Sequence, residues 1–159
     1  MKQEERKMKL AEALQERADI NKRISELKRR LDNCLLVQEG EEPAEDPAVL
    51  LKELDSATER LEKLMASINE TNCNTKVNGM SLTEIIAKKD ALCVRYSAYK
   101  DLVYTAGGST HRARGTEIKV KAVIKAAELQ KTVDKLAKEI RLLDNLLQET
   151  NWKTELAEK

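Results

Sequence analysis

Carboxylate side chains are concentrated in one short stretch of this sequence. Five of them fall within eight residues, and these are Glu39, Glu41, Glu42, Glu45 and Asp46. Such a cluster can pair with arginine through charge-assisted hydrogen bonds or bind a divalent cation. It can also be a solvated turn that keeps two helix ends soluble. The spacing lacks the alternating Asp/Asn and the closing Glu of a calcium loop, which disfavours the cation.

A basic segment elsewhere in the chain could complement these carboxylates. The polar stretch 109–115 contains Arg112 and Arg114 beside the only histidine, His111. We therefore predict an assembly clasp between residues 39–46 and these two arginines, in the same chain or in a neighbouring copy. Exposed ion pairs contribute about 0–1 kcal/mol each, so a clasp would select a geometry more than it would stabilise it.

Other residue patterns that carry chemistry are missing from the sequence. It contains no phosphate-binding glycine loop, no G-x-S-x-G and no H-E-x-x-H. Cys34, Cys73 and Cys93 lack the C-x-x-C spacing of a zinc or redox site. Cys34 falls on an apolar stripe, where we expect a buried, unreactive thiol. We predict a non-enzymatic protein with no catalytic residue, metal, cofactor or small-molecule substrate.

Composition narrows the class of protein. Charged residues make up 36% of the chain, aromatic residues make up 3%, and phenylalanine is absent. Such a composition is typical of long helices and coiled coils. The net charge of +1 gives no overall field for nucleic acid or anionic lipid. The density of basic residues over 112–125 nevertheless keeps nucleic-acid binding as an alternative function.

Three further features of the sequence bear on where in the cell the protein is found. The charged stretch 1–9 has no apolar core of the kind that a signal peptide needs. The longest apolar runs are far too short to cross a membrane. Together with the unclustered cysteines, these features lead us to expect a cytoplasmic protein.

Four segments must position these residues, and each repeats apolar residues in alternating steps of three and four. They begin at Leu10, Leu50, Leu82 and Leu129. This spacing predicts four long coiled-coil-type helices. Additional apolar residues widen each stripe, which favours bundling of several helices within or between chains.

Helix boundaries are marked by short local signals. Asp46-Pro47 predicts a helix start, and so does the capping box that Ser81 forms with Glu84. Asn78-Gly79 predicts a tight turn before that box, and Gly107-Gly108 predicts a helix end. The chain therefore divides into two helical hairpins, residues 8–77 and 81–156, within a single helical domain spanning residues 1–159.

The two hairpins share a sequence register at an offset of 79 residues. Glu-Thr-Asn-x-x-Thr occurs at residues 70–75 and again at 149–154. We therefore predict an internal duplication, with coincidence of two similar helix endings as the alternative. Asn72 and Asn151 are expected to end their helices in the left-handed conformation, with Trp152 anchoring that junction. A small β element is predicted near 74–77, 116–123 and 152–156.

A family resemblance rests on four stretches. These are residues 8–14, the acidic Gln-Glu-Gly-Glu-Glu-Pro segment within 37–47, and the endings at 71–72 and 151–156. The chain resembles, over about residues 8–158, a family of small uncharacterised bacterial helical proteins, some of which carry the name septicolysin. The resemblance implies a mostly helical fold and homo-oligomers, and the septicolysin name implies a membrane-active cytolysin. The function that we predict is a self-assembling helical structural or interaction protein.

Overall fold

The computed structural model describes residues 7–108 and 120–157, and helices dominate this part of the chain. The chain divides into two compact units. Unit 1 contains residues 1–77 and 150–159, and unit 2 contains residues 78–149. The predicted mainly α fold with a small β element is confirmed. The prediction of a single domain stays a prediction.

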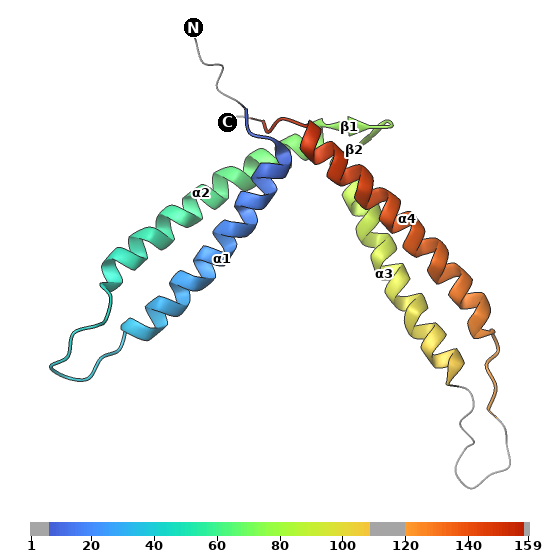
Figure 1. The fold of residues 1–159 in the computed structure, drawn as a ribbon, viewed down its shortest axis with the longest axis horizontal. Helices are drawn as coiled ribbons and strands as arrows, with labels where there is room; N and C mark the ends of the chain where they lie inside the picture. Colours follow the sequence, from blue (N-terminus) through green and yellow to red (C-terminus); the bar gives the residue numbers. More distant parts are fainter. Residues whose placement is uncertain (1–6, 109–119, 158–159) are drawn as a thin grey trace, which may run out of the picture. The chain divides into compact units, whose positions relative to one another are not determined.

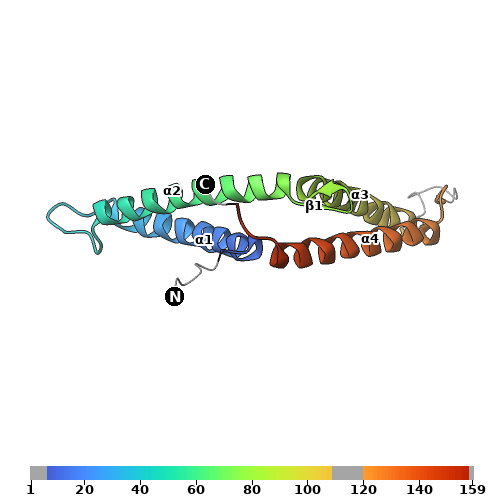
Figure 2. The same ribbon diagram turned by 90° about the horizontal axis from the view of Figure 1, so that it is seen from above.

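Unit 1 is built on a pair of neighbouring helices, α1 (Leu10–Cys34) and α2 (Pro47–Asn74), which Figures 1 and 2 both show side by side. The side chain of Glu12 accepts a 2.8 Å hydrogen bond from the Lys9 amide at the start of α1. The Asp46 carboxylate caps α2 by accepting from the Ala48 amide at 2.9 Å. α2 begins at Pro47, as predicted. Proline fits this first position because its missing amide hydrogen would have no partner within the helix.

The apolar stripes of α1 and α2 form the core of unit 1. One cluster lies toward the connector end of the pair, and it comprises Leu27, Leu31, Cys34 and Leu50 with Leu54 packed against it. Each of the four buried members is at most 6% exposed. Cys34 is 5% exposed, which confirms the predicted burial of its thiol. Leu64 and Ile68 continue the buried stripe along α2.

The C-terminal segment completes unit 1 as an extended strap. The Leu10 amide donates to the Thr154 carbonyl at 2.9 Å, and the Leu156 amide donates to the Met8 carbonyl at 2.8 Å. The buried Thr71 hydroxyl, near the end of α2, accepts from the Ala157 amide at 2.9 Å. Backbone and side chain together therefore fix this strap to both helices of the unit.

Unit 2 is built on α3 (Leu82–Gly107) and on most of α4 (Ala126–Lys153). The predicted capping box at the start of α3 is present, because the Ser81 amide donates to Glu84 at 2.7 Å and the Glu84 amide donates to Ser81 at 3.2 Å. α3 also ends at the predicted Gly107. Leu82 and Ile85 are buried in α3, and Val133, Leu136 and Leu147 are buried in α4.

The small β element is a two-stranded hairpin of β1 (Lys76–Val77) and β2 (Met80–Ser81). The predicted turn between the strands has positive φ at both positions, 52° at Asn78 and 83° at Gly79. Both values fit a two-residue hairpin turn, in which asparagine and glycine are favoured. Near 152–156, Glu155 forms an isolated antiparallel bridge with Lys9.

Three local predictions are wrong. The described residues 120–123 form no strand, and 116–119 lie outside the described residues. Asn72 and Asn151 do not end their helices, which continue to Asn74 and Lys153. The helices continue because the Thr71 and Thr150 carbonyls each accept an amide from four residues on, at 2.9 Å. Trp152 is 52% exposed and buries too little to anchor the junction.

The 79-residue offset reappears in the helix bounds. Adding 79 to the ends of α2, Pro47 and Asn74, gives the ends of α4, Ala126 and Lys153. Both helices contain 28 residues. The first helices agree less well, because α1 begins seven residues later than the offset of α3 requires. The second helix of each pair therefore follows the offset more closely than the first, and the predicted duplication stays a prediction.

Candidate association surfaces

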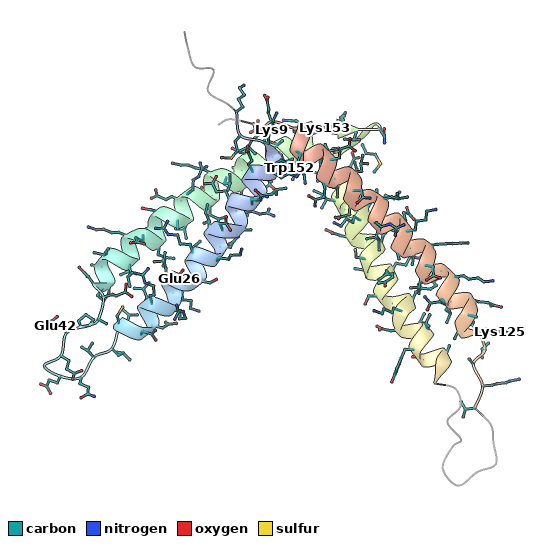
Figure 3. The ribbon with its side chains drawn as sticks, in the orientation of Figure 1. Lys9, Glu26, Glu42, Lys125, Trp152 and Lys153 are labelled. Atoms are coloured by element: carbon teal, nitrogen blue, oxygen red, sulfur yellow. The ribbon has the colours of Figure 1, made fainter. Side chains whose placement is uncertain are left out.

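The acidic segment meets a basic residue of its own unit. The Arg30 guanidinium, near the end of α1, donates Nε to both carboxylate oxygens of Glu45 at 3.1 and 3.0 Å, and its Nη2 donates as well. Asp46 serves as the helix cap described above. Glu39, Glu41 and Glu42 are exposed, and Figure 3 labels Glu42 in the connector between α1 and α2.

Sequence reasoning missed the pairing of Glu45 with Arg30. A connector of about a dozen residues returns the chain toward the end of α1, where Arg30 lies. The arginines predicted for the clasp, Arg112 and Arg114, lie outside the described residues. The predicted clasp with them stays a prediction, as does nucleic-acid binding through 112–125.

The ion pair shifts the pKa of both partners. Hydrogen bonding from Arg30 stabilises the ionised form of Glu45 and lowers the pKa of that carboxyl. The same hydrogen bond, which Glu45 accepts, raises the pKa of Arg30. Both groups are charged at neutral pH, so the pair orders the second half of the connector at the start of α2.

A shallow groove runs between the two helices of unit 1. We call it groove A, and it encloses about 440 Å³. Ile20, Val49, Ser56 and Ala57 form its floor. Ile20 and Ala57 are half-buried, and Val49 is 51% exposed. Apolar side chains thus remain accessible between two helices that bury the rest of their stripes.

Paired opposite charges form the rims of groove A. Arg60 donates to both carboxylate oxygens of Glu16, at 2.7 and 2.8 Å. The hydrogen bond that Arg60 donates to Glu16 raises the pKa of Arg60, so the guanidinium stays charged. Farther along, Arg23 pairs with Glu53 at 3.2 Å. Each rim therefore carries both signs of charge.

A second groove lies between α3 and α4 in unit 2. We call it groove B, and it encloses about 480 Å³. Tyr96, Ala137 and Ile140 give it an apolar floor beside the exposed thiol of Cys93. Lys89 and Asp144 form an ion pair across it. Groove B thus repeats the plan of groove A with different residues.

An apolar pocket lies where α3 ends and α4 begins. We call it the end pocket, and it encloses about 410 Å³. Its apolar lining comprises Leu102, Ala106, Val120, Val123, Ile124 and Leu129. Val123 is 99% exposed, and Val120 and Ile124 are each 54% exposed. The pocket is therefore open to a partner of apolar character.

Two searches of the described residues concern other kinds of site. Within 7–108 and 120–157, no three His, Cys, Asp or Glu side chains gather as a metal ion would require. Among the helices of that same part of the chain, none is long and apolar enough to cross a membrane.

The fold and these surfaces define a protein of paired long helices with accessible apolar grooves. More particularly, the chain belongs to a family of unknown function (DUF6847), whose model matches residues 17–156. A functionally unknown conserved protein from Corynebacterium diphtheriae, known from a crystal structure, is 40% identical with a TM-score of 0.89. The match covers 96% of this chain and 100% of that one.

A search of the curated proteins found no match. The resemblance to small uncharacterised helical proteins is therefore supported at the level of a family of unknown function. The septicolysin name, with its implied cytolysin activity, is supported by neither the family nor the solved structure.

Proposed function

We propose that this chain is a non-enzymatic assembly protein whose copies associate by packing groove A of one copy against groove A of another. The observation that supports the proposal is the accessible apolar floor of groove A between rims of paired opposite charges. Two helices alone offer each other one face, so the widened stripes leave apolar area that a four-helix arrangement of two copies would cover.

Charge favours a second copy as the occupant. Both rims carry an acidic and a basic residue, Glu16 with Arg23 on α1 and Glu53 with Arg60 on α2. In a twofold contact the same surface meets itself, so a rim with both signs can oppose carboxylates to guanidinium groups. The net charge of +1 adds little repulsion between copies.

The size of the surface is also sufficient. A helix with the length of α1, 25 residues, is about 38 Å long, and two adjacent helices form a face about 20 Å wide. This face offers roughly 800 Å² to a partner, which is the area that a standard-sized interface buries on each side. We place the assembly in the cytoplasm, since Cys93 is an exposed thiol that a reducing compartment preserves.

Sedimentation equilibrium of the full chain at micromolar concentration tests the proposal. We expect a dimer that the double variant Val49→Glu, Ser56→Lys weakens at least tenfold. The first change removes apolar contact and the second places an ammonium group on the floor of the groove. Both residues are exposed, and glutamate in the first turn of α2 is favourable for the helix. Thermal melting by circular dichroism should therefore be unchanged for the isolated chain.

Val94→Glu is the matched control. Val94 is 72% exposed on α3 and does not line groove A. It should leave the dimer constant unchanged. A wild-type chain that is strictly monomeric at micromolar concentration would contradict the proposal. So would equal weakening of the dimer by the groove variant and by the control.

A further inference from the structure

The end pocket of unit 2 has the chemistry of a receptor for aliphatic side chains. Its lining is almost entirely apolar, and Val123 is 99% exposed at its mouth. An open apolar patch of this kind is costly in water and marks an interaction site. Its volume of about 410 Å³ lies in the range of pockets that bind small ligands or a few side chains.

Unit 1 carries an exposed aliphatic segment of matching character. Leu35, Leu36 and Val37 directly follow the end of α1 and are 58%, 89% and 50% exposed. They lie outside the buried cluster that contains their neighbour Cys34. These three consecutive aliphatic residues therefore leave at least half of their surface in water.

The charges beside these two surfaces are opposite. The carboxylates of Glu39, Glu41 and Glu42 follow the aliphatic segment and are exposed. Lys121 lines the end pocket, and Lys125 directly precedes α4, where Figure 3 labels it. Both lysines are exposed. Lysine offers a mobile point charge rather than the fixed fork of arginine, so such a contact would attract without setting a strict geometry.

We propose that the end pocket of one copy receives residues 35–37 of a second copy, with Glu39, Glu41 and Glu42 facing Lys121 and Lys125. The inference shares with the proposed function only the premise that copies of the chain associate. The contact itself uses neither groove A nor groove B. Two different surfaces meet in it, so the contact is heterologous and can extend an assembly beyond a dimer. Its ionic part is exposed and therefore weakens as salt rises.

Cross-linking between two populations of the full chain tests this contact. Both populations carry Cys73→Ser, Cys93→Ser and the groove A variant described above. One also carries Leu36→Cys, and the other, labelled with ¹⁵N, carries Val123→Cys. A bis-maleimide should join the two populations at least tenfold faster than it joins Leu36→Cys chains to chains with Leu142→Cys. Leu142 is 56% exposed on α4, away from the end pocket.

A charge exchange supplies the second measurement. Adding Glu41→Lys and Glu42→Lys to the first population should lower the cross-linking rate at least threefold. Adding Lys121→Glu and Lys125→Glu to the second population should then restore it. These residues are exposed, so folding should be preserved in every variant.

Several outcomes would overturn the inference. One is a rate equal to that of the Leu142→Cys control, and another is a rate that does not respond to the charge exchange. A further variant that carries both Leu36→Cys and Val123→Cys and cross-links only within single chains would assign the pocket to the chain's own segment. Every cross-linking population carries the groove A variant, so the cross-link reports on the end pocket without the groove dimer. If sedimentation of the wild-type chain shows the groove A dimer but this cross-link does not form, only the present inference is contradicted. The cross-link without a groove dimer contradicts only the proposed function.

Discussion

The two units use equivalent second helices to support different surfaces. α2 and α4 have the same bounds at an offset of 79 residues, and both bury part of their apolar stripes. The burial nevertheless differs at equivalent positions. Leu50 is 2% exposed in unit 1, whereas its equivalent in unit 2, Leu129, is only half-buried and lines the end pocket.

Grooves A and B also lie on different sides of the apolar stripe of the second helix. Groove A uses α2 residues that include Val49, Glu53 and Arg60. The α4 residues of groove B are equivalent, after subtraction of 79, to positions 58, 61, 62 and 65. At about 100° per residue these two sets lie on opposite flanks of the same stripe. The second helices of the two units therefore offer different faces, and the units are not interchangeable partners.

The largest expected difference between the units is the stability lost when an equivalent leucine near the start of the second helix is truncated. Leu50→Ala removes a fully buried side chain and should lower the free energy of unfolding by about 3 kcal/mol. Leu129→Ala should cost about 1 kcal/mol, because its side chain is already partly hydrated. Urea unfolding of dilute protein, followed by circular dichroism, measures both costs. Equal losses would show that the pocket around Leu129 is closed in solution.

A smaller effect should follow from the C-terminal strap of unit 1. The Thr71 hydroxyl donates to the Ser67 carbonyl at 2.7 Å and accepts from the Ala157 amide. Thr71→Val keeps the shape but leaves that amide without its acceptor, at a cost of about 1–3 kcal/mol. Hydrogen exchange at Ala157 should accelerate in the variant.

The control is Thr58→Val. Its hydroxyl is exposed and donates only to carbonyls of its own helix, at 3.1 and 2.8 Å. We expect a change within about 0.5 kcal/mol, as for surface substitutions in general. If Thr71→Val and Thr58→Val lower the free energy of unfolding equally, the hydrogen bond to the strap adds no stability.

The smallest effect concerns the acidic connector of unit 1. The pKa of Glu45 is lowered by its hydrogen bond from Arg30, so the carboxyl binds its proton less readily in the folded chain than in the unfolded one. The pair therefore stabilises the fold above the ordinary glutamate pKa of about 4.3. This stabilisation is lost as pH falls through the lowered pKa.

Arg30→Gln should return the pKa of Glu45 toward its ordinary value. A carbon-detected NMR titration of the carboxyl group measures this change. Arg29→Gln, which alters the exposed neighbour, should leave the pKa of Glu45 where it is in the parent chain. A low pKa that survives Arg30→Gln would assign the shift to another cause.

Local signals in the sequence predicted the helix starts well. Asp46-Pro47 and the Ser81 box act through neighbouring atoms, so their effect does not depend on the rest of the fold. The burial of Cys34 followed equally from its place on the α1 stripe. Helix periodicity requires that such a position face the partner helix.

Contacts between distant residues could not be predicted in the same way. Glu45 was assigned to a clasp with Arg112 and Arg114, whereas Arg30 pairs with it inside unit 1. The partner depends on the path of the connector, which no residue type encodes by itself. Asn72 was expected to end its helix because asparagine tolerates positive φ. That tolerance permits an end without requiring one, and the positive φ instead occurs at Asn78.

The strap across unit 1 has a consequence for the order in which the chain folds on the ribosome. Thr71 and Ala157 are 86 residues apart, and all of unit 2 lies between them. At a synthesis rate of 5–20 residues per second, Thr71 is made roughly 4–17 s before its partner. When Ala157 is made, all of unit 2 has already been synthesised, and the C-terminal strap of unit 1 is only then being added. The first-made helices therefore receive their final hydrogen bonds only after all of unit 2 has been synthesised.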